Sequence, residues 1–254
     1  MTDFKPYSPR AATGGGGWLQ RSPSTTAARR VFCIPHAGFG AGVYGNWPEQ
    51  RHGVEFLPIE LPGRLSRFAD PMPPTFAELA TDLIAGLEPY LDVPFAFFGH
   101  CWSALLAYEI TAQLQHAGGP SATRLYVSSQ QAPQDGPAGR MLSMDDAQLA
   151  VELESTIRAQ GSKPYPELVA IYLEMLRNDV EISRRYVVPE PPRVRCPITA
   201  IGWTEDCEVP PAQMAGWPVC GDTAFKVFAG PHGRFIDAPP ELLKTLCAGM
   251  YDRG

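Results

Sequence analysis

A cysteine lies at the centre of a short segment that could form a covalent acyl intermediate. Residues 99–103 read Gly-His-Cys-Trp-Ser, close to G-x-S-x-G, in which small flanking residues let the chain bend sharply and expose the central side chain. Near a helix N-terminus the thiolate of Cys101 would be favoured, and the N–H of Trp102 could face a developing oxyanion. The alternative is a structural cysteine, because free cysteine is often buried.

The flanking residues supply the elements that such a turn requires. Residues 93–98 form an apolar run typical of a buried strand, and apolar residues at helical spacing continue from Ser103 to about His116. Strand, sharp turn and helix would therefore present the thiol at the edge of a sheet.

Strands and helices alternate along most of the chain. Further strands are predicted at residues 31–34, 54–59, 124–128, 197–201 and 224–229, and further helices at 75–90 and 239–251. Thr75 and Glu78 form a capping box at the start of the first of these helices. The alternation predicts an α/β fold: a mostly parallel sheet, right-handed crossovers, and helices on both faces.

The alternation is interrupted between the strand at residues 124–128 and the strand at 197–201. Two helical segments, 145–160 and 165–186, follow one another with no strand between them. We predict a helical lid insertion over about residues 135–190, above the sheet edge where substrate would enter. The alternative is that these helices only cover the sheet.

Length and composition favour one domain. With 254 residues and 44% apolar content the chain can bury one full core, which we assign to residues 30–254. Residues 1–29 are rich in Gly, Ser, Thr, Pro and Ala, and we predict a disordered N-terminal tail there.

Charge and cysteine content exclude several classes of partner. The net charge of −6 argues against nucleic acid. The lack of a long apolar run or a leader-like start argues against a membrane partner and favours a cytoplasmic protein. Six scattered cysteines without a C-x-x-C pair argue against a zinc site, and we expect no metal or cofactor. We expect a monomer, because no extended apolar surface stripe is apparent.

A nucleophilic cysteine needs a base, and the base needs a group that fixes its tautomer. In α/β-hydrolases these follow in the order nucleophile, acid, histidine. His232 comes just after the predicted strand 224–229 and is the only histidine beyond the helix that follows Cys101, so we predict it as the base. His36 and His100 lie in the candidate loop and turn, where we expect them to point away from the thiol.

The candidate acid is Asp206, which follows the predicted strand 197–201 at the same sheet edge. Asp179 is its rival, but we interpret it as a solvated residue of a lid helix. Asp222 precedes its strand and so lies at the wrong end, whereas Glu205 could substitute for its neighbour.

The loop at residues 35–40, Pro-His-Ala-Gly-Phe-Gly, is the candidate source of a second oxyanion donor. In hydrolases with this kind of turn, the loop after an early strand supplies that N–H. Ala37 or Gly38 is placed to do so, and we take Ala37 together with Trp102 as the candidate oxyanion hole.

Several motifs in fixed order resemble type II thioesterases, stand-alone α/β-hydrolases that accompany polyketide synthases and nonribosomal peptide synthetases. The resemblance covers roughly residues 30–251, and its motifs include Pro35-His-Ala-Gly38, Leu61-Pro-Gly-Arg64, Phe98-Gly-His100, Leu125-Tyr-Val-Ser128 and Cys196-Pro-Ile-Thr-Ala200. It implies an α/β-hydrolase fold with a mobile lid, and as partner an acyl or peptidyl carrier protein that presents a phosphopantetheine thioester.

By the same resemblance, Cys101 stands where the nucleophilic serine is usual, Asp206 where the aspartate is, and His232 where the histidine is. The family usually has Ser-Met-Gly where this chain has Cys-Trp-Ser. A cysteine thioester keeps the acyl group nearly as activated as the carrier thioester does, so it suits transfer as well as hydrolysis.

The leading hypothesis is therefore hydrolysis of carrier-bound acyl or aminoacyl groups. An acyltransferase or cyclase, with an amine, alcohol, carbanion or second carrier thiol as acceptor, is the first alternative. An inactive carrier-binding scaffold is the second.

Carrier docking would need a local basic cluster, because this chain and the carriers of the family are both acidic. The candidates are Arg64, Arg67, Arg140, Arg158 and Lys163. The alternative for each is a solvated surface charge.

Overall fold

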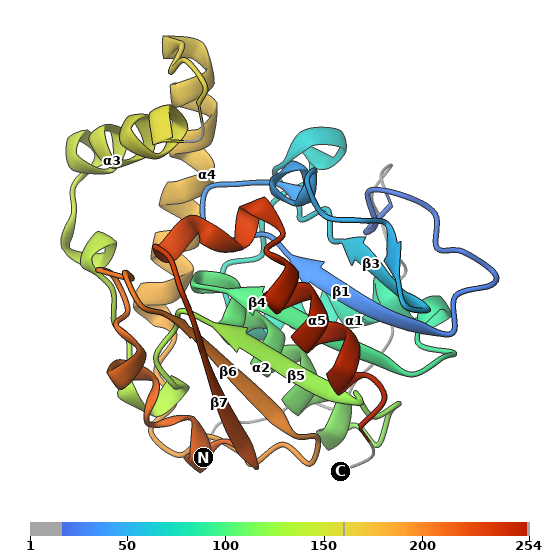
Figure 1. Ribbon diagram of the computed structural model, residues 1–254. Coiled ribbons are helices and arrows are strands. Elements are labelled where there is room, and N and C mark those ends of the chain that lie inside the picture. Colours follow the sequence, from blue (N-terminus) through green and yellow to red (C-terminus); the bar gives the residue numbers. More distant parts are fainter. Residues whose placement is uncertain (1–16, 160, 253–254) are drawn as a thin grey trace.

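The computed structural model describes residues 17–252 except residue 160 (Figure 1). Its described residues form a seven-stranded sheet in the order β2-β3-β1-β4-β5-β6-β7. The strands are β1 (Arg29–Ile34), β2 (Gln50–Arg51), β3 (Val54–Pro58), β4 (Phe95–His100), β5 (Arg124–Ser128), β6 (Ile198–Trp203) and β7 (Thr223–Phe228). The short β2, which the sequence analysis did not predict, pairs antiparallel with β3, and the other neighbours pair in parallel.

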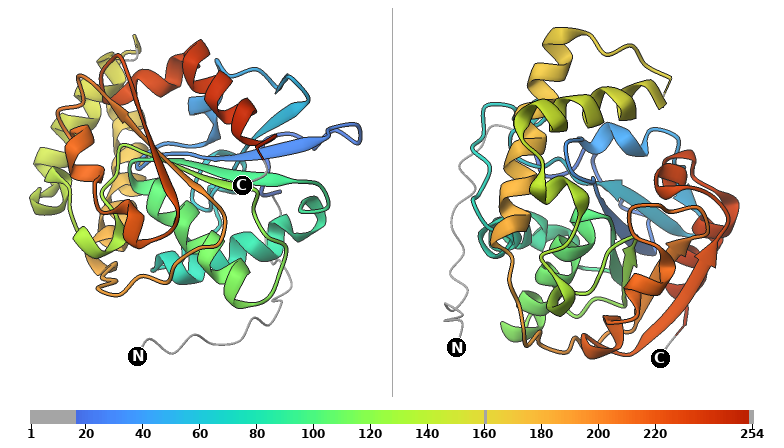
Figure 2. Two further views of the ribbon diagram at one scale, coloured as in Figure 1. Left: turned by 60° about the horizontal axis from the view of Figure 1, so that its bottom comes forward. Right: turned by 90° about the vertical axis from the view of Figure 1, so that its left-hand side faces the viewer.

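Helices cover both faces of the sheet, as the alternation of elements predicts (Figure 2). Helices α1 (Phe76–Leu87) and α2 (Trp102–His116) pack on one face, and α5 (Pro240–Gly249) packs on the other. The predicted cap is present: the Thr75 hydroxyl accepts the N–H of Glu78 at 3.2 Å.

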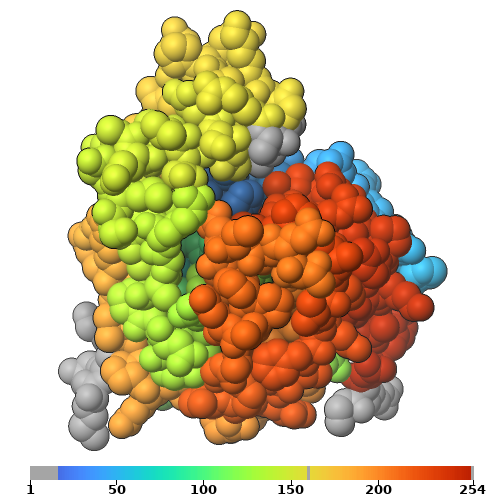
Figure 3. Space-filling view, turned by 60° about the vertical axis from the view of Figure 1, so that its left-hand side comes forward, coloured from blue at the N-terminus to red at the C-terminus, as the bar shows by residue number. Residues whose placement is uncertain are grey.

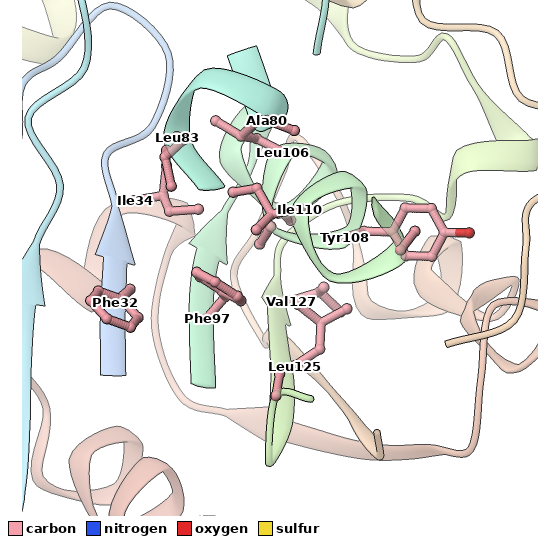
Figure 4. Packing of buried hydrophobic residues seen from close by; sticks show 14 of the residues in the cluster. Phe32, Ile34, Ala80, Leu83, Phe97, Leu106, Tyr108, Ile110, Leu125 and Val127 are labelled. Carbon is pink, nitrogen blue, oxygen red and sulfur yellow. The ribbon is translucent and has the colours of Figure 1, made fainter. Parts of the chain in front are cut away.

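Strand β1 shows how one apolar run serves two faces. Phe32 and Ile34 belong to the cluster under α1 and α2, whereas Val31 and Cys33 belong to the cluster under α5. All four are fully buried, as expected for a parallel strand covered on both sides. Figure 4 shows the first of these clusters, in which β1, β4 and β5 meet the two helices.

The predicted lid insertion is helical and lies between β5 and β6. Helices α3 (Asp146–Ala159) and α4 (Pro166–Arg185) stand beyond the end of the sheet toward which β4 and β5 point (Figure 1). They share a small apolar cluster, and Leu176 of α4 contacts the loop after β1 at Gly38. Every helix of the described residues is too short or too polar to cross a membrane.

The segment before β1 differs from the predicted disordered tail. Residues 1–16 lie outside the described residues, but residues 17–28 pack on the domain. The Trp18 ring is buried, and the guanidinium of Arg67 lies 3.8 Å from its centroid. Leu19 forms a β-bridge with Ile59. The prediction is wrong for these residues because one large aromatic side chain anchors a segment that is otherwise small and polar.

A glycine in α1 makes room for this anchor. A Cβ at Gly86 would lie 1.8 Å from the Trp18 ring. Alanine normally favours a helix over glycine by up to about 1 kcal/mol. We expect Gly86→Ala instead to lower the free energy of unfolding by about 1–3 kcal/mol, because the indole must move. Urea denaturation measures this change.

In a Trp18→Ala background the same change should be neutral or stabilising. Gly42→Ala is the matched control, because a Cβ at Gly42 would meet nothing within 4 Å. An equal loss of stability with and without the indole would contradict this account of Gly86.

Candidate active site

The turn between β4 and α2 is as sharp as the sequence predicts. Cys101 has φ 55° and ψ −130°, a conformation that costs a residue with a Cβ about 1–3 kcal/mol. Its N–H donates to the carbonyl of Ser128 at 2.8 Å. A Cβ at Gly99 would lie 2.2 Å from the carbonyl oxygen of Ser103. The first turn of α2 can therefore pack this closely against the end of β4 only because residue 99 is a glycine. The bend leaves the thiol of Cys101 half-buried.

Ser103, at the position where the turn motif has glycine, ties the turn to its surroundings. Its hydroxyl accepts the N–H of His100 at 3.0 Å and lies 2.9 Å from the carbonyl oxygen of Ile34. The side chain is fully buried. The Ser103 side chain therefore stabilises the bend through hydrogen bonds, which the glycine of the motif could not form.

The structure brings the predicted base and acid together. His232 follows β7, and its Nδ1 lies 2.9 Å from Oδ2 of Asp206, which follows β6. The other oxygen of Asp206 accepts the N–H groups of Glu208 and Val209, both at 2.9 Å. His232 also interacts with the side chain of Cys101. The carboxylate, the imidazole and the thiol therefore form a connected series of side chains.

The charges of Asp206 and His232 stabilise each other. Burial lowers the pKa of His232, but hydrogen bonds to Asp206 and Cys101, together with their charges, raise it to about 10. Burial raises the pKa of Asp206, but the hydrogen bond and charge of His232 hold it below its ordinary value. A protonated imidazole beside a carboxylate is therefore favoured at neutral pH, as needed for a group that holds a proton taken from a thiol.

Two other histidines lie near His232 and are uncharged. The Nδ1 of His100 lies 2.9 Å from the hydroxyl of Ser128, and the His100 ring stacks on Phe235. Burial lowers the pKa of His36 to about 3 and that of His100 well below its ordinary value. Neither side chain carries charge at neutral pH.

The candidate oxyanion donors lie on two segments. Trp102 is the first residue of α2, so its N–H is among those with no acceptor inside the helix. Of the two loop candidates, the N–H of Gly38 donates to Oδ2 of Asp179 at 2.8 Å. No hydrogen bond within residues 17–252 apart from 160 engages the N–H of Ala37. Ala37 is therefore the better donor for a ligand.

Comparison with known proteins identifies the family. The model of the thioesterase domain matches residues 29–248, most of the chain. The chain belongs to the thioesterase family. The predictions of an α/β-hydrolase fold and of a thioester hydrolase are confirmed by this match and by solved thioesterase structures.

Several relatives are similar over most of their length. The chain is 30% identical to thioesterase PikA5 of Streptomyces venezuelae over 226 residues, 85% of this chain and 79% of that protein. It is 29% identical to the gramicidin S biosynthesis protein GrsT of Aneurinibacillus migulanus over 244 residues, 91% and 92% of the two chains. The type II thioesterase BorB from the borrelidin biosynthetic cluster superposes with a TM-score of 0.78 at 27% identity, covering 92% and 97%.

Asp179 of this thioesterase is buried, so its predicted role as a solvated lid residue is wrong. Its carboxylate binds the guanidinium of Arg64, which is itself 2% exposed. The pKa of Asp179 is raised above its ordinary value because burial outweighs two opposing effects, the charge of Arg64 and the hydrogen bond from the Gly38 N–H. The missed signal was helical spacing: Asp179 lies three residues after Leu176 and one before Val180, on the apolar face of α4.

Two members of the predicted basic cluster are not available for docking. Arg64 is buried against Asp179, and Arg67 is 8% exposed and binds the carboxylate of Asp70 at 2.8 Å. Arg140 and Arg158 are more exposed but form salt bridges with glutamates. The prediction is wrong for the first two because their side chains turn inward to close loops, a direction that sequence alone does not give.

The thioesterase surface is hollowed next to the lid. Figure 3 shows a recess between the yellow lid and the orange to red C-terminal segments. A small pocket lies between α2, the loop after β5 and α4, and its lining residues are Leu105, Gln130, Gln131, Ala132, Pro133, Gly136, Pro137, Ala138, Ser183 and Tyr186. Among the described residues, no three His, Cys, Asp or Glu side chains gather as a metal ion would require.

The raised pKa of His232 predicts a stability that depends on pH. Its folded value, about 10, lies above the ordinary 6.5. The stabilisation is therefore fully present below about pH 6.5 and is lost as the pH rises through about 10. We expect the difference in unfolding free energy between the wild type and His232→Gln to shrink from pH 6.5 to pH 10, as measured by urea denaturation.

Asp206→Asn removes one cause of the shift and should weaken this pH dependence. A difference between wild type and His232→Gln that stays constant across the range would contradict the raised pKa.

Proposed function

We propose that this chain is a type II thioesterase that acts in trans. Its substrates would be acyl or aminoacyl groups that carrier proteins of a polyketide or nonribosomal peptide pathway hold as phosphopantetheine thioesters. The similarity to BorB, GrsT and PikA5 supports the pathway type. The observation that carries the proposal is the chain of contacts from Asp206 to His232 to Cys101, in a member of the thioesterase family.

The first half of the proposed reaction transfers the acyl group to the enzyme. Cys101 attacks the thioester carbonyl, and Nε2 of His232 holds the proton of the thiol. The N–H groups of Ala37 and Trp102 stabilise the oxyanion. The bond from the carbonyl carbon to the phosphopantetheine sulfur then breaks, and His232 returns the proton to that sulfur. The products are acyl-Cys101 and a free carrier thiol.

In the second half, His232 takes a proton from water as the water attacks the acyl-Cys101 carbonyl. Collapse of this second intermediate releases a carboxylic acid and returns the proton to the Cys101 sulfur. Asp206 holds the Nδ1 proton throughout, so Nε2 always faces the reacting atoms. These steps use protein groups alone, and we propose that a monomer without a cofactor performs them.

The cysteine itself favours a second candidate, acyl transfer or cyclisation. Acyl-Cys101 is a thioester, nearly equal in free energy to the carrier thioester from which it forms. An amine, alcohol, carbanion or second carrier thiol could therefore take the place of water. Intact-mass analysis of an acyl-carrier substrate, with and without such acceptors, separates hydrolysis from transfer.

Replacement of the nucleophile tests both candidates. Cys101→Ala should abolish turnover and the covalent acyl adduct, whereas Cys101→Ser should keep some hydrolysis because serine is the usual nucleophile of the family. Intact mass reports the adduct, and release of free carrier thiol reports turnover.

The matched control is Cys207→Ala, which removes an exposed cysteine. It should retain turnover and remain sensitive to thiol alkylation at Cys101. Full activity after complete alkylation of Cys101, or an inactive wild type that only binds carrier, would refute the proposed mechanism.

Replacement of the acid tests the orientation of the base. Asp206→Asn should lower kcat by as much as about 10⁴-fold, the loss known for serine proteases. The loss should be smaller if thiolate and imidazolium already form an ion pair. Asp222→Asn, an exposed aspartate before β7, should leave kcat unchanged. A silent Asp206→Asn would require another acid.

A further inference from the structure

One residue of the lid touches both segments that carry the candidate oxyanion donors. Asp179 of α4 accepts the N–H of Gly38 through Oδ2, at 2.8 Å, and its backbone carbonyl accepts the indole N–H of Trp102, also at 2.8 Å. The same Oδ2 binds Arg64, whose Nε donates to the carbonyl of Phe39 at 2.8 Å. The buried carboxylate of Asp179 thus joins the lid to the loop after β1, and the backbone carbonyl of the same residue joins the lid to the start of α2.

These contacts fix the direction of the loop backbone. Gly38 has φ 75°, and its N–H turns toward the lid. The peptide that links Ala37 to Gly38 therefore cannot rotate without breaking the bond to Asp179. The turn is closed on the other side by the N–H of Phe39, which donates to the carbonyl of His36 at 3.3 Å, so the peptide that carries the N–H of Ala37 is held as well. The indole bond likewise holds Trp102, whose backbone N–H is the other candidate donor.

A purely structural role would not need a carboxylate here. Asp179 is fully buried, and its Oδ1 has no hydrogen-bond partner in the described residues. A buried ion pair gives little net stability, and an apolar pair of similar volume often stabilises a fold as well or better. What an apolar pair cannot do is accept the N–H of Gly38 and so set the direction of the loop.

We propose that Asp179 is a positioning residue for the oxyanion hole: its carboxylate orients the N–H of Ala37 toward the oxygen of the acyl group on Cys101, and its backbone carbonyl holds Trp102, the other donor. This inference rests on the proposed function, because it assigns these donors to an acyl intermediate. It also couples the lid to the reaction: the oxyanion hole is complete only while α4 holds the loop after β1.

Two reactions of the same thiol separate this role from a general effect on the site. Acylation by a small acyl N-acetylcysteamine thioester forms an oxyanion, so it needs both donors. Alkylation by iodoacetamide displaces iodide at a saturated carbon and forms no oxyanion, so it reports only the thiol and His232. The readouts are kcat/KM for the thioester and the rate of alkylation as a function of pH.

In Asp179→Leu, which cannot accept the N–H of Gly38, we expect kcat/KM to fall about 10²-fold, the scale of one lost oxyanion donor, while alkylation keeps its rate within about twofold and its pH dependence. The matched control is Asp146→Asn, which removes an exposed ion pair between α3 and Arg177 of α4. It should change neither rate. If Asp179→Leu, which leaves Arg64 buried without a partner, fails to fold, Arg64→Met with Asp179→Leu removes both buried charges together and takes its place.

Equal losses in acylation and alkylation would overturn the inference, because Asp179 would then support the site as a whole. Unchanged acylation would overturn it too, by showing that the donors need no help from the lid. A wild type that forms no acyl adduct on Cys101 would instead overturn the proposed function, and the inference with it.

Discussion

The backbone bend at Cys101 is the constraint on which the rest of the site depends. A non-glycine residue keeps φ 55° only where its neighbours fix it. Here the Cys101 N–H is held by the carbonyl of Ser128 on β5, and Ser103 is held by the carbonyl of Ile34 on β1. The strands on both sides of β4 therefore stabilise the turn. Because β4, β6 and β7 all point the same way, the loops after β6 and β7 bring Asp206 and His232 to the same edge.

The lid closes over this edge through charge as well as apolar packing. Leu176 and Asp179 lie on one face of α4, and both contact the loop after β1, the first by packing and the second by hydrogen bonding. With Arg64 also buried, the ion pair lies in a low-dielectric interior, where its geometry is specific and separation is costly. A lid that opened fully would expose this pair to water and release Gly38, so the position of the lid and the geometry of the loop are linked.

Much of the fold was predictable because its signals are local. Apolar runs predicted the parallel strands, and Thr75 and Glu78 predicted a helix cap. The order of residues at the strand ends pointed to Asp206 and His232. The residues that were misread depend on distant partners. Arg64 and Asp179 are 115 positions apart, and each alone looks like an ordinary surface charge. Trp18 is buried only because Gly86, far along the chain, leaves space for its ring.

The surroundings of His232 suit it to the role of a base. In the proposed mechanism His232 takes the proton of the Cys101 thiol, so fixed charge near the ring would alter its affinity for that proton. The two closest histidines, His36 and His100, are buried and neutral, and Asp206 is the carboxylate bound to the ring. In the proposed mechanism acyl-Cys101 is a thioester, which a second thiol opens with little change in free energy and which water, an alcohol or an amine opens with a favourable one. The outcome then depends on which acceptor reaches the carbonyl, and α4, the helix that carries Asp179, stands beyond the sheet edge where we propose that carbonyl to lie.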